Sequence, residues 1–99
     1  MSWKAQYEQF NAWHDMKFLS LEVNENPGGI VKGHGIDEVG EFTFEGSFSQ
    51  ADPVVRILKQ YKGKHAIYYE GRRTSPGEIN GDWGFEPGEK DGKFRMKKF

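Results

Sequence analysis

The chain has 99 residues, of which 35% are hydrophobic, 15% aromatic and 29% charged, and it contains no cysteine. This length suits one domain, residues 1–99, and the missing cysteines exclude a disulfide framework and thiolate chemistry. No apolar run approaches the roughly 20 residues that cross a bilayer, and no apolar leader resembles a secretion signal. We therefore expect a soluble, cytoplasmic protein with no membrane partner.

The net charge of -1 hides an imbalance between the two halves of the chain. Residues 1–50 hold eight acids and three bases, whereas residues 51–99 hold seven acids and eleven bases. Such a dipole could steer an anionic partner toward the second half. We favour the interpretation that the charge asymmetry reflects attraction between two halves of one barrel wall, or that it is incidental.

The first quarter of the chain predicts strands, with one ambiguous segment. In residues 3–10 the apolar positions fit both a strand and a helix, and we favour the strand. Residues 11–14 are then expected to form a turn. Residues 15–24 alternate more clearly, and they place Leu19 and Leu21 on the same face.

The middle of the chain predicts a hairpin. Residues 30–36 are typical of a short strand, in which Gly33 and Gly35 mark places where the strand bends sharply or another backbone comes close. A turn at residues 37–40 follows, with a glycine at positive φ. Residues 41–49 form the clearest strand, because phenylalanines alternate with polar residues.

The second half predicts three further strands and a terminal one. Residues 54–61 could be helical by propensity, but valine and isoleucine at alternate positions favour a strand. Residues 61–85 then form a hairpin, with Trp83 and Phe85 on the inner face of its second strand. Phe94 faces inward in the last strand. Clusters of Pro, Gly, Asn and Asp predict turns at residues 24–29, 49–53, 72–77 and 86–92.

These elements predict an all-β fold. About eight strands without a crossover helix should pair antiparallel as an up-and-down meander, and eight strands can close into a small barrel. We therefore expect a closed or nearly closed barrel filled by aromatic side chains. Its predicted core consists of Leu19, Leu21, Phe42, Phe44, Phe48, Ile57, Ile67, Ile79, Trp83, Phe85 and Phe94.

Two spacings carry a resemblance to a known group of folds. They are Gly33-x-Gly35-x-Asp37-x-x-Gly40-x-Phe42-x-x-x-Gly46, and Lys59-x-Tyr61-x-Gly63-x-His65-x-x-x-Tyr69-x-Gly71 followed by Ile79-x-Gly81-x-Trp83. Together they resemble the glycine–aromatic meander of small calycin-like β-barrel proteins, over about residues 30–85. The resemblance to calycins implies a ligand in the barrel mouth. This chain departs from them because its Gly-x-Trp lies in the seventh predicted strand, not the first, and because it is short for a lipocalin.

The favoured function is a small non-catalytic binding or interaction module, with a small apolar ligand as its candidate partner. The candidate ligand-binding residues are His34, His65, Tyr69 and Trp83. We assign no cofactor. His34 and His65 are residue types that bind metal or haem iron, but neither HxH nor HExxH spacing is present, so we assign no metal. The oligomeric state is left open.

Asp37 is expected to hold its turn by accepting a hydrogen bond from the backbone N–H two residues on, with an active-site carboxylate as the alternative. No nucleophile has a partner at a recognisable spacing, so no catalytic residue is assigned and an enzyme is not the favoured interpretation.

Two other functions stay open. One is single-stranded nucleic-acid binding through the basic and aromatic surface Lys59–Arg73, which a sequence pI near 6.3 disfavours. The other is an enzyme resembling small-barrel cyclases or isomerases, by fold analogy alone.

Overall fold

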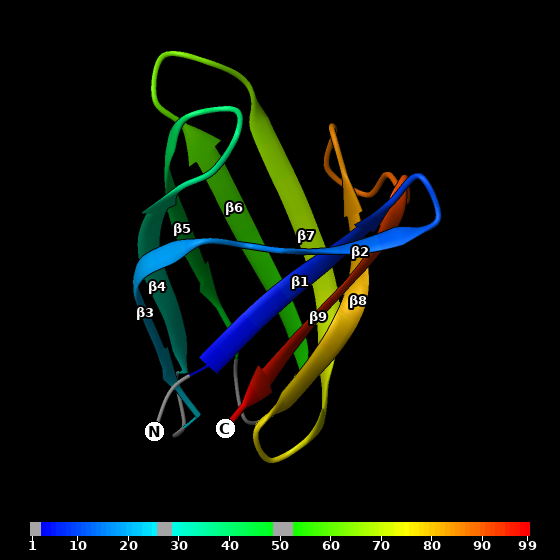
Figure 1. The fold of residues 1–99 in the computed structure, drawn as a ribbon. Coiled ribbons are helices and arrows are strands. Elements are labelled where there is room, and N and C mark those ends of the chain that lie inside the picture. The colour runs from blue at the N-terminus through cyan, green and yellow to red at the C-terminus, as the bar shows by residue number, and fades with distance from the viewer. Residues whose placement is uncertain (1–2, 26–28, 49–52) are drawn as a thin grey trace.

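The fold is an up-and-down meander of nine antiparallel strands (Figure 1). The computed structural model describes residues 3–25, 29–48 and 53–99. The strands are β1 (Trp3–Gln9), β2 (Ala12–Asp15), β3 (Phe18–Asn24), β4 (Ile30–Ile36), β5 (Glu41–Ser47), β6 (Val54–Tyr61), β7 (Ala66–Ser75), β8 (Glu78–Gly84) and β9 (Gly92–Lys98). None of the described segments contains a helix that could span a membrane.

The strands form one strongly curled half-barrel sheet, in the order β2-β1-β9-β8-β7-β6-β5-β4-β3. Its two edge strands, β2 and β3, are consecutive in the chain and are joined by Met16 and Lys17. The Met16 amide donates to the Ala5 carbonyl of β1 at 2.9 Å, and the Ile36 amide of β4 donates to the Lys17 carbonyl at 3.2 Å. The chain itself therefore crosses the open side of the sheet and links its two edges (Figure 1).

The predicted all-β meander is confirmed, and the N-terminal segment adds one strand to the expected eight. The segment 3–10 is a strand up to Gln9, as favoured, but the predicted turn at 11–14 is mostly strand β2. The reversal occurs at Phe10 and Asn11, whose φ angles are 54° and 60°. Two successive residues with positive φ form the tight turn that matches the twist of a hairpin. The predicted turns at 24–29 and 49–53 lie largely outside the described residues.

The core follows the predicted alternation in most strands. The buried apolar side chains are Ala5, Met16, Val31, Phe42, Phe44, Phe48, Val55, Ile57, Tyr61, Ile67, Tyr69, Ile79, Trp83, Phe94 and Met96. They include eight of the eleven predicted core residues, and Leu21 packs against them as a partly buried side chain.

Two predicted core residues are wrong, and each has a local cause. Leu19 is 70% exposed because a β-bulge between Phe18 and Ser20 shifts the register of β3 and turns Phe18 inward in its place. Phe85 is 49% exposed because β8 ends at Gly84, so the strand alternation does not reach it.

Gly35 confirms the prediction that a glycine in this strand marks close approach of another backbone. A Cβ atom at this position would collide with the carbonyl oxygen of Lys17 and would lie 2.8 Å from Cζ of Phe42. Lys17 belongs to the connection that links the two edges of the sheet. Glycine is therefore required where that connection crosses β4.

Replacement of Trp83 by alanine tests the core. The side chain is 5% exposed, and its indole N–H donates to the Glu8 carbonyl at 2.8 Å. We expect Trp83→Ala to lower the free energy of unfolding by about 3–5 kcal/mol, because it leaves a cavity and an unpaired carbonyl. Urea unfolding followed by circular dichroism measures the loss. Phe85→Ala is the matched control and should lose less than half as much, whereas equal losses would contradict this packing.

Candidate functional site

An aromatic cavity of about 260 Å³ lies at one end of the half-barrel. The β6–β7 turn, which contributes to it, is at the upper end in Figure 1, away from the C-terminus. The turn between β4 and β5, the turn between β6 and β7 and the start of the loop after β8 surround it. The residues that line it are Tyr7, Gln9, Val39, Lys59, Tyr61, His65, Ile67, Tyr69, Trp83 and Phe85. Six of these ten side chains are aromatic rings or imidazole, so the cavity is largely apolar.

The period of two along the strands places these side chains. In β6 the inward positions are Val55, Ile57, Lys59 and Tyr61, all buried. Ile67 and Tyr69 occupy the inward positions of β7. The ring of Trp83 meets the ring of Tyr7 edge-on, with centroids 6.4 Å apart. The strand that supplies the aliphatic core thus also delivers a lysine into the cavity wall.

Lys59 is the one buried charged residue in the described part of the chain, with 1% of its surface exposed. Its ammonium group donates to Oδ2 of Asp37 at 2.9 Å. The same group lies over three aromatic rings, 4.3 Å from the centroid of Phe42, 5.0 Å from Tyr61 and 5.7 Å from Tyr7. A carboxylate and ring faces both attract a cation, so together they offset part of the cost of removing the ammonium from water.

Asp37 has two roles, one predicted and one not. Its Oδ1 accepts the Val39 amide at 2.9 Å, which confirms the predicted hydrogen bond to the backbone two residues on. Its Oδ2 accepts both the Lys59 ammonium and the Tyr61 hydroxyl, the latter at 2.6 Å. The carboxylate therefore ties the β4–β5 turn to the end of β6, across 22 residues of sequence.

The surroundings shift the pKa values of this group of residues in opposite directions. Burial raises the pKa of Asp37, but hydrogen bonds from Tyr61, Lys59 and the Val39 amide outweigh burial and hold that pKa below its usual value. Burial lowers the pKa of Lys59, and the neighbouring Asp37 opposes this only in part. Burial, followed by the hydrogen bond to Asp37, raises the pKa of Tyr61.

The Tyr69 side chain lines the cavity. Burial raises the pKa of this residue well above its ordinary value. Within the described ranges no fully buried side-chain polar atom lacks a hydrogen-bond partner, and none of the hydrogen bonds found there uses this hydroxyl. The hydroxyl is therefore not fully buried, and it can donate to or accept from a molecule bound against Tyr69.

Three of the four predicted ligand-binding residues lie around this one cavity. Tyr69 and Trp83 form part of its wall, and the imidazole of His65 stands at the rim with its centroid 5.2 Å from that of Tyr61. His34 does not join them. It is exposed on the opposite face of β4, where it lines a separate concavity of about 440 Å³ together with Leu19 and Ile36.

The sequence prediction missed Lys59, Asp37 and Tyr61 as a group. A signal was present, because Lys59 occupies an inward position between Ile57 and Tyr61 in an otherwise apolar alternation. A lysine at such a position needs a carboxylate partner. The sequence alone does not say which of 15 acidic residues supplies it.

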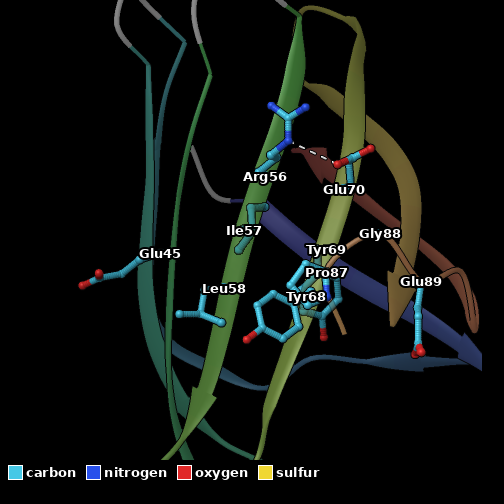
Figure 2. Close-up of a pocket in the computed structure, with 10 residues that line it drawn as sticks. All are labelled: Glu45, Arg56, Ile57, Leu58, Tyr68, Tyr69, Glu70, Pro87, Gly88 and Glu89. Atoms are coloured by element: carbon cyan, nitrogen blue, oxygen red, sulfur yellow. Dashed lines mark hydrogen bonds and ion pairs between the residues drawn. The ribbon is translucent and has the colours of Figure 1, made fainter. Parts of the chain in front are cut away.

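A second concavity lies outside the barrel, between β6, β7 and the loop after β8. It measures about 270 Å³ (Figure 2). Leu58 and Tyr68 are paired across the two strands there, and Arg56 donates to Glu70 at 3.2 Å. This groove contains an ion pair that is more than half exposed, and no buried polar group like Lys59. We therefore take the inner cavity as the candidate site.

The predicted nucleic-acid surface is divided between the two faces of the sheet. Lys59, Tyr61 and Tyr69 point inward and are buried, whereas Arg56 and Arg72 are exposed. No group of three or more His, Cys, Asp or Glu side chains that could hold a metal ion occurs in the described residues. Comparisons with family models, curated proteins and solved structures found no match.

Removal of the charge on Asp37 tests the buried ion pair. Asp37→Asn keeps an oxygen that can accept from the Val39 amide. It replaces the oxygen that accepts from Tyr61 and Lys59 with an NH2 donor, and it leaves the Lys59 ammonium without a counter-charge. We expect a loss on the order of 3 kcal/mol in the free energy of unfolding. The matched control is Glu41→Gln, which removes the exposed partner of Lys62 at 3.7 Å and should change stability by less than about 1 kcal/mol. Equal effects would show that the inner pair has no special role.

The lowered pKa of Asp37 also predicts an acid dependence. Because this pKa is lower in the folded than in the unfolded protein, the stabilisation is complete above the unfolded value of about 3.9 and is lost as pH falls through the native value. The stability difference between wild type and Asp37→Asn should stay constant from pH 7 to pH 5 and shrink below about pH 4. Urea titrations across this range measure it, and a difference that persists to the lowest pH would contradict the assignment.

Proposed function

We propose that this protein is a small-molecule binding module whose ligand occupies the aromatic cavity above Lys59. The observation that carries the proposal is an apolar cavity with a buried lysine in its wall, whose ammonium is paired with Asp37. Ligand pockets are typically apolar concavities with a few convergent polar groups. The outer groove in Figure 2 lacks this combination.

The size and charge of the cavity narrow the class of ligand. A volume of about 260 Å³ lies just below the range of about 300–1,000 Å³ that is typical of ligand pockets, which suits a molecule of one or two fused rings. Asp37 and Lys59 carry opposite charges 2.9 Å apart, so the wall favours a neutral ligand. The Tyr69 hydroxyl and the rings supply one hydrogen-bonding group and stacking faces.

The earlier resemblance supports the same proposal. Calycins hold ligands in the barrel mouth, and this cavity lies at one end of a curled meander. The calycin-like assignment and the cytoplasmic location remain predictions from sequence. Nucleic-acid binding has less support, because stacking bases would need outward rings and Tyr61 and Tyr69 line the cavity instead.

Binding of N-phenyl-1-naphthylamine, a neutral fluorescent probe, tests the proposal. We expect its emission to rise and shift to shorter wavelength with micromolar protein. The variant Val39→Trp adds a large ring at the cavity rim and should weaken binding at least about tenfold, since the ring takes up the space of the probe.

The matched control adds the same ring outside the cavity. Ile36 is 48% exposed and lines the concavity on the other face, so Ile36→Trp should bind the probe as wild type does. If wild type fails to bind, or if both variants bind equally well, the cavity is not the ligand site.

A further inference from the structure

We propose that Lys59 is a nucleophilic lysine, which forms an imine with a small aldehyde or ketone held in the aromatic cavity. The inference rests on the proposed function, because the carbonyl compound would occupy the same cavity as the neutral ligand. It goes further by assigning a covalent chemistry to one nitrogen atom.

The first support is the setting of the Lys59 nitrogen. Lys59 lines the cavity, yet only 2% of its side chain is exposed, and the ring centroids of Phe42 and Tyr61 lie within 5.0 Å of its nitrogen. Lysines that react with carbonyl compounds are activated by removal from water in such apolar pockets. The lowered pKa of Lys59, caused by burial, agrees with this setting.

The second support is the arrangement of a nucleophile, a base and groups that orient the base. Oδ2 of Asp37 lies 2.9 Å from the Lys59 nitrogen, within the distance needed for proton transfer. The carboxylate is held by the Val39 amide on Oδ1 and by the Tyr61 hydroxyl on Oδ2. This is the spatial pattern expected of an activated nucleophile.

The reaction balances without a further reagent. The Lys59 ammonium passes one proton to Asp37, and its lone pair then forms a bond to the carbonyl carbon. One proton moves from the nitrogen to the former carbonyl oxygen, which gives a hydroxyl group. Asp37 returns its proton to that hydroxyl, the C–O bond breaks, and water leaves. The product is a protonated imine beside the Asp37 carboxylate.

The charges of the site favour this product. The ammonium and the protonated imine each carry one positive charge and at least one N–H, so Asp37 keeps both its counter-charge and its hydrogen bond. The cation also stays over the rings of Phe42 and Tyr61. The new substituent extends into the aromatic cavity, so the product needs no additional buried charge.

The exposed lysines provide the contrast. The Lys62 side chain is 83% exposed and lies 3.7 Å from a Glu41 oxygen that is itself in water. Its ammonium is hydrated, so it lacks the apolar surroundings that activate a lysine toward carbonyl compounds. Lys59 is the one buried lysine in the described ranges, so preferential reaction there would be informative.

Trapping with 2-naphthaldehyde and sodium cyanoborohydride tests the proposal. The hydride reduces any imine to a stable secondary amine, and peptide mass spectrometry then locates it. With less than one equivalent of aldehyde, we expect Lys59 to be modified at least about tenfold faster than Lys62. Lys59→Arg should abolish that adduct, whereas Lys62→Arg should leave it unchanged. Val39→Trp should slow it while Lys59 remains in place.

The outcomes separate this proposal from the binding function. If N-phenyl-1-naphthylamine binds but the aldehyde modifies only exposed lysines, the imine proposal is overturned and the binding proposal stands. If the probe fails to bind and Lys59 is also spared, both are overturned. An adduct at Lys59 that Val39→Trp does not slow would place the reaction outside the cavity and overturn the assignment.

Discussion

The structure depends most on one constraint, which is that a lysine buried in an apolar sheet must find a counter-charge. Lys59 occupies an inward position of β6, and Asp37 in the β4–β5 turn is the acid bonded to it among the residues that the structure describes. An unpaired ammonium at this depth would cost several kcal/mol. The requirement therefore fixes the turn over the end of β6 and brings aromatic ring faces around the nitrogen.

The covalent link between the two edges of the sheet holds it in its curled form, and this curl surrounds the Lys59–Asp37 pair. A nine-stranded meander has two free edges, and here the short stretch Met16–Lys17 carries the chain from one edge to the other. Glycine at position 35 permits that crossing. The curl brings β1 toward the far strands, so Tyr7 faces Lys59 although 52 positions separate them in the chain. The cavity therefore depends on the curvature of the sheet as much as on the types of residue that line it.

Most of the fold could be predicted from alternation and turn chemistry. Phe42 and Phe44 are buried because residues two apart share a face of a strand, and that rule needs no knowledge of neighbours. It fails where the backbone leaves the regular ladder. The bulge between Phe18 and Ser20 turns Leu19 to the outer face of the sheet. Phe85 follows the last residue of β8, so the alternation of that strand does not bury it. The roles of Tyr69 and Trp83 at the cavity follow the same inward alternation, whereas His34 lies on the other face.

The sequence by itself determined that the chain is all-β, which faces of its strands are apolar, and that Asp37 caps its own turn, because these are local properties of two to ten residues. Only the tertiary structure decided that Asp37 also meets Lys59 and Tyr61, and that Tyr7 and Trp83 enclose the same space. Such contacts depend on the register, the bulges and the curl of the whole sheet, which many strand pairs determine together. The sequence therefore predicts that a buried charge needs a partner, and the fold determines which residue that partner is.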